Sequence, residues 1–176
     1  MSTAVHTYTA RLVWEGNTGE GTRSYTSYSR RYRVRMPGKP ELAGSSDPAF
    51  RGDAELYNPE DLFLAAVSAC HMLSYLALCA RQRVRVLAYE DHAEGAMTVY
   101  AGGGGRFTEI TLHPCVTVDG DEQIELATRL HDAAHERCFI ANSCRVPIRH
   151  DALVRAEASA SPVRDAVHTR IESRRA

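Results

Sequence analysis

The sequence predicts an α+β fold in which strands surround two helices. Three observations indicate this class: strand-like segments fill the first third of the chain, a long apolar helix follows, and a second helix comes after further strands. With 176 residues, 44% hydrophobic and 24% charged, the chain has the size and composition of one globular domain. We place this domain at residues 1–158 and expect residues 159–176 to form a peripheral helix or a frayed tail.

The first third is predicted to be a β-region. Residues 4–15 and 22–36 are rich in Thr, Val and Tyr with partial alternation, and a glycine-rich turn separates them. Residues 37–57 contain many turn-forming residues and no helical period, so we expect a loop there. Loops of this length that carry charged and aromatic residues are often functional.

A helix is predicted to begin after Asn58. Asn58 suits the N-cap, and Pro59 suits the first helical position. Glu60 and Asp61 suit the positive end of the helix dipole. The following residues are apolar on nearly all sides as far as Cys79, whereas a surface helix shows only an apolar stripe. We therefore expect a central helix that is buried on most faces, by a sheet or by a second subunit.

Strands and a second helix are predicted for the rest of the chain. Residues 84–100 and 106–118 are strand-like, and the four consecutive glycines between them indicate a hairpin. Residues 121–138 form an amphipathic helix, and residues 145–157 resemble a last strand. The stripe of this helix consists of Ala127, Leu130, His131, Ala134 and Cys138.

Charge and leader patterns argue against nucleic acid, membranes and export. The formal net charge is −1, so no basic excess points to nucleic acid or to an anionic membrane. The N-terminal residues lack the basic-then-apolar order of a signal peptide. Polar residues interrupt residues 62–80, the segment nearest to a membrane span. Five cysteines is an odd number, which favours a reducing cytoplasm and thiols kept for reactivity or packing.

Two of these thiols are candidate reactive groups, Cys70 in the long helix and Cys138 at the end of the second helix. Cys70 lies ten residues beyond Glu60, about 15 Å along a helix, and the dipole effect fades after the first turn. A reactive Cys70 therefore needs a cation from elsewhere, and arginine suits this role because it stays charged. The alternative is that Cys70 is an inert core residue.

The remaining cysteines are weaker candidates. Cys79 lies about half a turn round the helix from Cys70, so we expect it to face away and to belong to the core. Cys115 is expected to be incidental on its strand, and Cys144 could act as a spare thiol.

The spacing of His131, His135 and Cys138 offers an alternative zinc site. Two histidines at positions i and i+4 of a helix can bind zinc. However, Asp132 stands where the usual zinc helix has Glu, and no fourth ligand is evident. We therefore prefer the interpretation that these histidines face solvent.

Two motifs resemble those of the OsmC/Ohr family of small cysteine-based peroxidases. The first active-site motif of that family is similar to Asn58-Pro59-Glu60-x-Leu62, followed by Ser68-Ala69-Cys70. The second is similar to Ala134-His135-x-x-Cys138, followed by Asn142-Ser143. The order of the elements agrees as well, so the resemblance covers most of residues 8–157.

The resemblance implies an OsmC-like intertwined homodimer with two central helices wrapped by β-sheets. It implies that Cys70 is the peroxidatic thiol, that Cys138 is the resolving thiol, and that no metal or organic cofactor takes part. It also implies an arginine that pairs with Glu60 near Cys70. Arg51, nine residues before Glu60, is our first choice for this arginine, and Arg30 is the second.

The implied activity is thiol-dependent reduction of organic hydroperoxides, with hydrogen peroxide as a second candidate substrate. The chemistry passes through a sulfenic acid on Cys70 and a Cys70–Cys138 disulfide, which a small dithiol or a lipoyl-type reductant restores. We expect such an oxidoreductase to serve as a cytoplasmic antioxidant in the stress response. Phe63, Val67 and Met72 would suit an organic substrate, and they suit core packing equally. The alternative is a non-catalytic OsmC-like dimeric binding protein.

Helix geometry adds one inference about this site. Glu60 and Cys70 are too far apart on one straight helix to meet. Either Glu60 acts on the Cys70 of a partner subunit, or the helix begins later than Pro59. The chain also departs from the family pattern at His71 and Phe139. His71 lies one position round the helix from Cys70, so we expect no contact with its sulfur.

Overall fold

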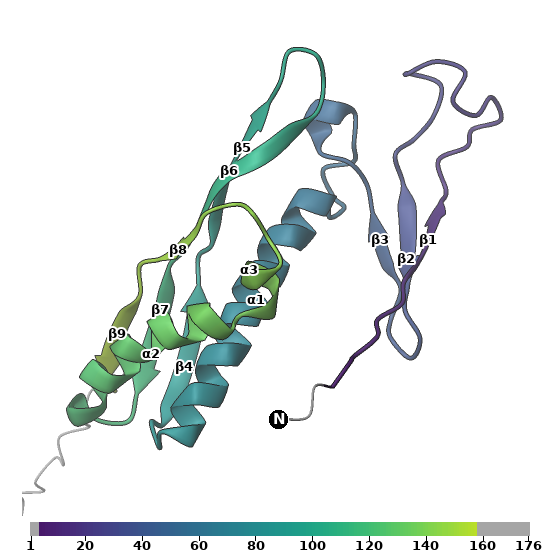
Figure 1. The fold of residues 1–176 in the computed structure, drawn as a ribbon. Coiled ribbons are helices and arrows are strands. Elements are labelled where there is room, and N and C mark those ends of the chain that lie inside the picture. Colours follow the sequence, from purple (N-terminus) through teal and green to yellow (C-terminus); the bar gives the residue numbers. More distant parts are fainter. Residues whose placement is uncertain (1–3, 158–176) are drawn as a thin grey trace, which may run out of the picture.

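The computed structural model describes residues 4–157 (Figure 1). In this part of the chain, two main helices and three three-stranded sheets form the α+β architecture that the sequence predicts. The tail expected at residues 159–176 lies outside the described residues.

The N-terminal sheet contains β1 (Arg11–Trp14), β2 (Tyr32–Arg35) and β3 (Leu42–Gly44), all antiparallel. β1 and β2 are shorter than predicted, and β3 lies in the segment that was expected to be a loop. The loop after β3 also contains a short 3₁₀ helix, η1 (Pro48–Phe50). The carboxylate of Asp47 accepts a hydrogen bond from the amide of Ala49 and so starts this turn. Figure 1 shows the N-terminal sheet standing apart from the other strands.

The long helix α1 (Pro59–Arg81) begins where the sequence predicts. The side chain of Asn58 accepts from the amide of Asp61, and the Asp61 carboxylate accepts from the amide of Asn58. This reciprocal cap fixes the start of α1 and excludes the later start considered above.

Only one face of α1 is buried by its own chain, so the sheets of this chain alone do not give the expected burial on most faces, and cover by a second subunit stays a prediction. The buried positions recur at helical spacing and are Val67, His71, Tyr75, Leu78 and Cys79. The opposite face exposes small and apolar side chains, among them Ala65, Ala69, Ala77 and Leu73, which is 63% exposed. By length and composition alone α1 could cross a membrane, but core helices pass the same criterion.

Each of the three predicted strands of the second half is divided in two. The elements are β4 (Val86–Asp91), β5 (Glu94–Val99), β6 (Gly105–Leu112), β7 (Pro114–Val118), β8 (Ile148–His150) and β9 (Leu153–Ala156). β4, β7 and β9 form one sheet, while β5, β6 and β8 form another, and the predicted glycine hairpin joins β5 to β6. One to two residues separate the halves of each strand, so the two sheets follow one another along the same path.

Asp91 holds the junction between the two sheets against α1. Its carboxylate accepts hydrogen bonds from the hydroxyl of Ser68 on α1 and from the amide of His113, between β6 and β7. The backbone groups freed at the break are thereby partly satisfied, as buried backbone groups must be. This contact could not be inferred from alternation within a strand.

The second helix is divided as well. A 3₁₀ turn η2 (Asp121–Gln123) precedes α2 (Ile124–Arg137), and a short helix α3 (Phe139–Asn142) follows at a sharp change of direction. The predicted apolar stripe of α2 is confirmed, because all its members are buried: Ala127, Leu130, His131, Ala134 and Cys138. In Figure 1, α1 and α2 lie on the same side of the strands.

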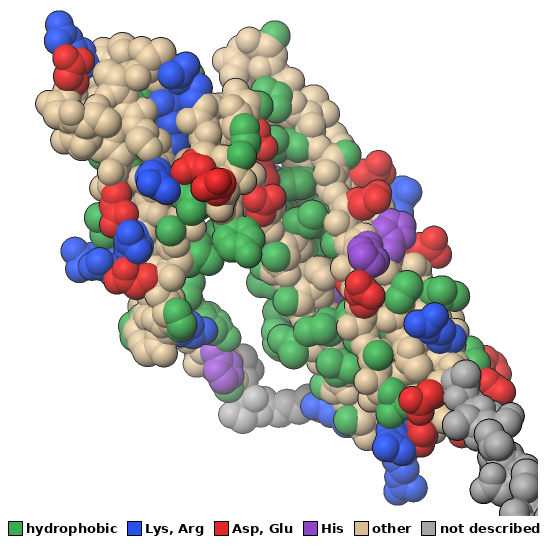
Figure 2. All heavy atoms as spheres, turned by 180° about the vertical axis from the view of Figure 1, so that it is seen from behind, with side chains coloured by type: hydrophobic (Ala, Val, Ile, Leu, Met, Phe, Trp, Pro, Cys, Tyr) green, Lys and Arg blue, Asp and Glu red, His purple; other side chains and the backbone are tan. Residues whose placement is uncertain are grey.

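Two clusters of buried side chains form the core. The larger one lies between α1, α2 and the sheet of β4, β7 and β9, and includes Tyr75, Val116 and Leu130. The smaller one lies between α1 and β6, and consists of Val67, Ile110 and Leu112. Apolar side chains also gather along the opening between the N-terminal sheet and the rest of the chain (Figure 2). This apolar surface has no partner within the described residues.

Candidate active site

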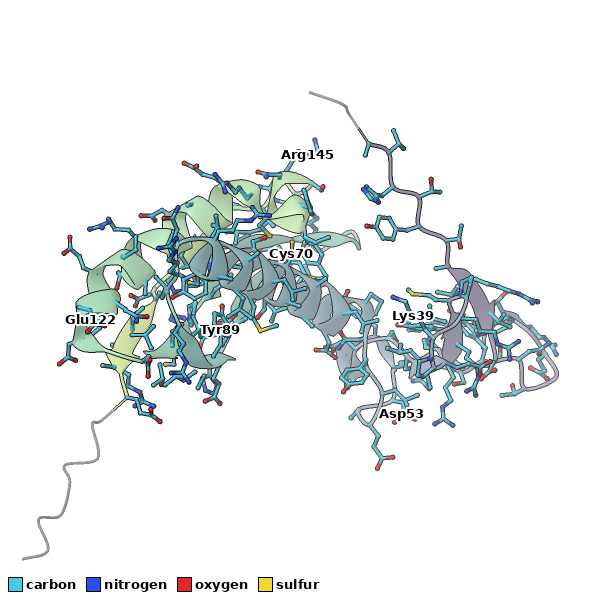
Figure 3. The ribbon with its side chains drawn as sticks, turned by 90° about the horizontal axis from the view of Figure 1, so that it is seen from below. Lys39, Asp53, Cys70, Tyr89, Glu122 and Arg145 are labelled. Atoms are coloured by element: carbon cyan, nitrogen blue, oxygen red, sulfur yellow. The ribbon has the colours of Figure 1, made fainter. Side chains whose placement is uncertain are left out.

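Cys70 lies on the side of α1 where the helix passes α3 (Figure 3). It is partly exposed and lines a cavity of about 820 Å³. The α1 residues that share this cavity follow the helical repeat from Cys70, so one face of the helix forms one wall: Ala66, Ala69, Leu73, Ser74, Ala77, Leu78 and Arg81. Phe139 and Asn142 of α3 form part of the opposite wall, and Phe139 is 81% exposed.

Cys138 is placed at the corner between α2 and α3. It is 1% exposed and forms the N-cap of α3, where its sulfur accepts a hydrogen bond from the amide of Ala141 at 3.5 Å. The Cys70 side chain lies close enough to Cys138 to help raise the pKa of that thiol, and both cysteines are free thiols. The structure therefore brings together two sulfur atoms that are 68 positions apart in the sequence.

The surroundings of Cys138 favour its protonated form. Burial is the largest cause, and together with the contact to Cys70 it raises the pKa of Cys138 to about 11. The amides of Ala141 and Ile140 act in the opposite direction, because they donate hydrogen bonds to the sulfur. Cys138 is therefore a thiol at neutral pH, which does not suit an initial nucleophile but does suit a thiol that waits for an electrophilic sulfur.

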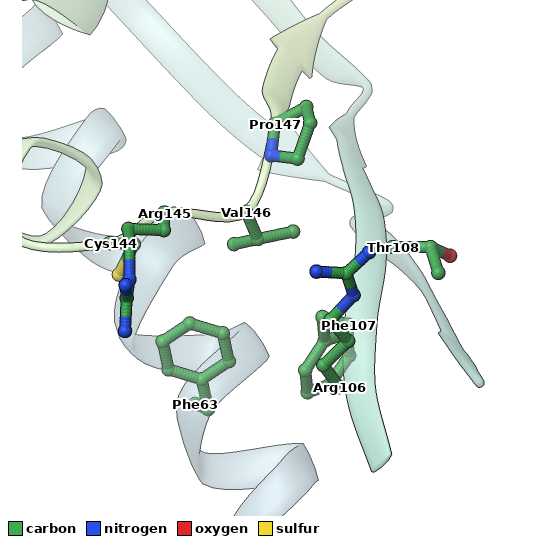
Figure 4. A pocket seen from close by; sticks show the side chains of 8 residues that line it. All are labelled: Phe63, Arg106, Phe107, Thr108, Cys144, Arg145, Val146 and Pro147. Carbon is green, nitrogen blue, oxygen red and sulfur yellow. The ribbon is translucent and has the colours of Figure 1, made fainter. Parts of the chain in front are cut away.

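The other cysteines lie away from this pair. Cys79 is in the core beside Tyr75, where burial raises its pKa, as expected for a packing residue. Cys115 is part of β7. Cys144 donates a hydrogen bond to the carbonyl of Ile140 at 3.0 Å. It lines a separate cavity of about 720 Å³ with Phe63, Phe107 and two arginines, and Cys70 does not line that cavity (Figure 4).

Comparison with known proteins identifies the family once this pair is located. A family model described as OsmC-like protein matches residues 52–152, a range that contains both cysteines. The chain belongs to the OsmC-like family. No curated protein is similar enough to the chain to count as a match.

Solved structures of OsmC-like proteins share this fold. An OsmC-like protein of unknown function from Vibrio cholerae is 29% identical, with a TM-score of 0.75 over 85% of this chain and 100% of that one. An organic hydroperoxide resistance protein from Elizabethkingia anophelis is 22% identical, with a TM-score of 0.64 over 89% of this chain and 100% of that one. A similar protein from Legionella pneumophila is 19% identical, with a TM-score of 0.59 over 86% and 98%. The last two likenesses establish the fold alone.

The arginine that the OsmC-like resemblance implies does not reach Glu60 within this chain. Arg51 is exposed, follows η1, and adopts a left-handed backbone conformation with φ of 64°. Arg30 donates to the carbonyls of Tyr25 and Tyr28, both at 2.6 Å, and its guanidinium lies over both tyrosine rings. Among residues 4–157, no ion pair involves Glu60. A single OsmC-like chain thus presents the two thiols without the implied arginine–glutamate pair.

Two other arginines line the Cys70 cavity, and the sequence reasoning missed both. Arg81 lies eleven residues after Cys70, which returns it to the same face of α1 after three turns. Arg137 directly precedes Cys138 at the end of α2. The rise from Cys70 to Arg81 is about 16 Å, which is too far for direct contact between the guanidinium and the sulfur. Together with Glu136 these arginines are the charged residues of the cavity lining, and they do not replace the missing pair.

The apolar walls of the cavity also differ from those expected. Phe63 and Val67 belong to the smaller core cluster, and Met72 lines a different cavity on the other side of α1. The apolar side chains beside Cys70 are instead Leu73, Leu78 and Phe139. The helical period explains Met72, which lies about half a turn round α1 from Cys70 at position i+2. It does not explain Val67 at i−3, which is buried because α1 packs there against Ile110 and Leu112 of β6.

His131 of α2 does not face solvent, so the preferred interpretation is wrong for this residue, whereas His135 is partly exposed. His131 is fully buried and makes a hydrogen bond with His71, with 3.0 Å between Nδ1 of His131 and Nε2 of His71. The described part of the chain contains no group of three or more His, Cys, Asp or Glu side chains that could hold a metal ion. The zinc alternative is therefore also wrong for His131, His135 and Cys138. His71 turns away from Cys70, as its position on the helix predicts.

Proposed function

We propose that this OsmC-like protein is a thiol-dependent peroxidase that reduces organic hydroperoxides. The contact between Cys70 and Cys138 is the observation that carries the proposal, because a peroxidatic and a resolving thiol must meet to form a disulfide. The partial exposure of Cys70 and the burial of Cys138 support this assignment of the two roles. The largely apolar lining of the cavity beside Cys70 suits an organic hydroperoxide better than hydrogen peroxide alone, and part of this lining belongs to the face of α1 that we assign below to the dimer interface.

The proposed chemistry has two steps. The Cys70 thiolate attacks the nearer oxygen of the O–O bond, that bond breaks, and the other oxygen leaves as an alkoxide that takes up a proton to give the alcohol. Cys70 is then a sulfenic acid. The sulfur of Cys138 attacks it, the S–O bond breaks, and the hydroxyl group leaves with the thiol proton as water. The resulting disulfide is reduced by exchange with a small dithiol or lipoyl-type reductant, which we place with this protein in the cytoplasm.

In a homodimer, a second copy of the chain would cover the exposed face of α1 and bring an arginine and Glu60 to Cys70. The exposed apolar face of α1 and the isolated N-terminal sheet both need cover, and a second copy of the chain can provide it. Because α1 begins at Pro59 and runs unbroken to Arg81, Glu60 cannot reach Cys70 of its own chain. We therefore place Glu60, with Arg51 or Arg30, at the Cys70 of the partner. In that position the guanidinium stabilises the Cys70 thiolate and the charge that develops on the oxygens.

The dimer has two direct tests. Light scattering of the purified protein should give a dimer, and Leu73→Lys, which places a charge on the exposed face of α1, should shift it toward monomer. Mixed dimers that carry Glu60→Ala in one subunit and Cys70→Ser in the other should retain one intact active site. In the shared arrangement, Cys70 of the first subunit meets the unchanged Glu60 of the second. If Glu60 serves its own subunit's Cys70, these mixed dimers have no intact site, which would contradict the shared arrangement.

Mass spectrometry after one equivalent of cumene hydroperoxide tests the activity itself. We expect a Cys70–Cys138 disulfide in the wild-type protein. Cys70→Ser should abolish peroxide consumption, whereas Cys138→Ser should allow one oxidation of Cys70 and then stall with dithiol reductants. Cys115→Ser is the matched control and should behave like the wild type. Peroxide consumption by Cys70→Ser at the wild-type rate would refute the proposal.

A non-catalytic OsmC-like binding dimer is the second candidate, favoured by the lack of a cation at Cys70 within one chain. The alkylation rate of Cys70 in the intact dimer separates the two functions. Rapid reaction with iodoacetamide near neutral pH indicates a thiolate and supports the peroxidase. A rate no higher than that of Cys115 supports the binding protein.

A further inference from the structure

A buried pair of histidines joins the two helices that carry Cys70 and Cys138. His71 directly follows Cys70 on α1, and His131 precedes Cys138 by two turns of α2. Their ring nitrogens are 3.0 Å apart, the ring planes differ by 10°, and the side chains are 1% and 0% exposed. Neither histidine has a place in the peroxidase chemistry described above.

This hydrogen bond is the principal polar contact of both rings. In the described part of the chain, the second nitrogen of each ring, Nδ1 of His71 and Nε2 of His131, is buried without a partner. The Tyr75 ring stacks on His131 with 3.9 Å between centroids, and His150 lies against both histidines. A single shared proton, held in a stacked apolar setting, therefore fixes one relative placement of the two rings.

Three titratable side chains influence the protonation of the histidine pair. His150 from β8 acts on both rings, and His135 from α2 and the carboxylate of Asp91 from β4 act on His71. The His150 ring is itself 3.3 Å from the carboxylate of Asp132. Burial and the neighbouring imidazoles lower the pKa values of His71 and His131, so both rings are neutral near pH 7 and their hydrogen bond is intact.

The position of the histidine pair on α2 affects where the sulfur of Cys138 lies. Cys138 lies seven positions after His131, about 10 Å along the direction of α2, so a tilt of about 10° about the histidine contact moves Cys138 by about 2 Å. An S–S bond is about 2 Å long and tolerates little distortion. Cys138 is also a poor nucleophile at neutral pH, because about one molecule in ten thousand carries the thiolate when the pKa is about 11. Resolution therefore depends on holding this sulfur in place.

We propose that the hydrogen bond between His71 and His131 is a positioning contact for disulfide formation between Cys70 and Cys138. It holds α2 against α1, so that the Cys138 sulfur stays in line with the sulfenyl sulfur of Cys70 while the S–O bond breaks and water leaves. The proposal rests on the proposed function and assigns its second step to a particular contact. His71 and His131 touch neither substrate nor the reacting atoms, so they position and do not catalyse.

The test separates oxidation from resolution in the full-length protein. After one equivalent of cumene hydroperoxide, dimedone trapping reports the Cys70 sulfenic acid, and mass spectrometry of quenched samples reports the disulfide. His131→Phe keeps the ring stacked on Tyr75 but removes the hydrogen bond. We expect it to oxidise Cys70 at the wild-type rate and to form the disulfide at least ten-fold more slowly, so that sulfenic acid accumulates.

Conservative variants and a matched control sharpen the result. The side-chain amide of glutamine can place its nitrogen where Nε2 of His71 lies and so keep the hydrogen bond to His131. His71→Gln should therefore form the disulfide at a rate within about two-fold of wild type. His92→Gln, at an exposed histidine in the turn between β4 and β5, should have no effect. If His131→Phe does not fold, the double variant His71→Phe/His131→Phe replaces both partners by apolar rings and leaves no unpaired group. Disulfide formation within two-fold of wild type in a folded variant that lacks the hydrogen bond overturns the proposal.

A redox equilibrium tests the positioning without peroxide. Glutathione buffers of known ratio measure how readily the Cys70–Cys138 disulfide forms in the wild type and in the double variant. Loss of the positioning contact should lower the equilibrium constant for disulfide formation by about ten-fold, and an unchanged constant contradicts it. If the wild type consumes no hydroperoxide, the proposed peroxidase function fails, and this equilibrium still decides the role of the histidines.

Discussion

The histidine pair predicts that the protein loses stability as the pH falls from 8 to 5. Burial, followed by the charges of neighbouring histidines, lowers the pKa of His71 from 6.5 to about 4 and that of His131 from 6.5 to about 3. Because the pKa of each ring is lower in the folded state, the unfolded chain binds protons between pH 6.5 and the folded pKa that the folded chain does not bind. The contribution to stability is therefore complete above pH 6.5 and is lost as the pH falls through the window toward 4 and 3.

The expected magnitude follows from the number of protons. Each proton that only the unfolded state binds lowers the free energy of unfolding by about 1.4 kcal/mol for every pH unit below the unfolded pKa. At pH 5 this amounts to about 2 kcal/mol for each ring, or about 4 kcal/mol for the pair. The value depends little on the folded pKa, because both folded rings are still mainly neutral at pH 5. With a urea m-value of about 2 kcal/mol per molar, the pair lowers the unfolding midpoint by about 2 M.

Urea unfolding followed by circular dichroism at pH 8 and pH 5 measures this difference. Protein concentration must be fixed, because association contributes to the stability of a dimer. The double variant His71→Phe/His131→Phe should lose about 4 kcal/mol less than the wild type between the two pH values. His92→Gln removes an exposed histidine and should lose as much as the wild type. An equal loss in the wild type and the double variant would refute the reasoning, because it would show that the buried rings do not resist protonation.

Three further predictions concern single contacts. Iodoacetamide at pH 7 should alkylate Cys138 about 100-fold more slowly than a cysteine with the reference pKa of 9.0, because burial raises its pKa to about 11; equal rates for Cys138 and Cys115 in a mass-spectrometric time course would contradict this. Asn58→Ala removes the side-chain acceptor at the start of α1 and should lower the free energy of unfolding by about 1 kcal/mol; an unchanged urea midpoint would show that the cap adds nothing. Asp91→Ala leaves the amide of His113 and the hydroxyl of Ser68 without their acceptor and should cost about 2–3 kcal/mol, whereas Asp91→Asn, which keeps one carbonyl oxygen, should cost less in the same assay.

Local sequence signals predict the start of α1, the buried stripe of α2 and one hairpin. The start of α1 follows from Asn58, Pro59 and the two acidic residues after them, which act on backbone groups within one turn. The buried stripe of α2 follows from the 3.6-residue period. The hairpin between β5 and β6 follows from its glycines, because only they adopt the required turn without strain. These features depend on neighbours in the chain, so one sequence suffices to predict them.

The breaks in the strands and the burial of His131 required the structure. Alternation continues across the break between β6 and β7, so the period alone predicts one strand where the structure has two, and Asp91 from the neighbouring strand β4 stabilises this break. His131 lies on the apolar stripe of α2, but histidine is a polar residue, so the sequence favoured exposure of its side chain to solvent. Its burial became acceptable only because His71, from another helix, provides a hydrogen bond.

By itself the sequence determined the two helices, the two cysteine motifs and the α+β class, since each is encoded by residues close together in the chain. Only the tertiary structure decided that Cys70 and Cys138 lie side by side, that Glu60 forms no ion pair within residues 4–157, and that one face of α1 remains uncovered. The physical reason is that these outcomes depend on how α1 crosses α2 and α3. That crossing is set by the packing of side chains some sixty residues apart, which no local pattern records.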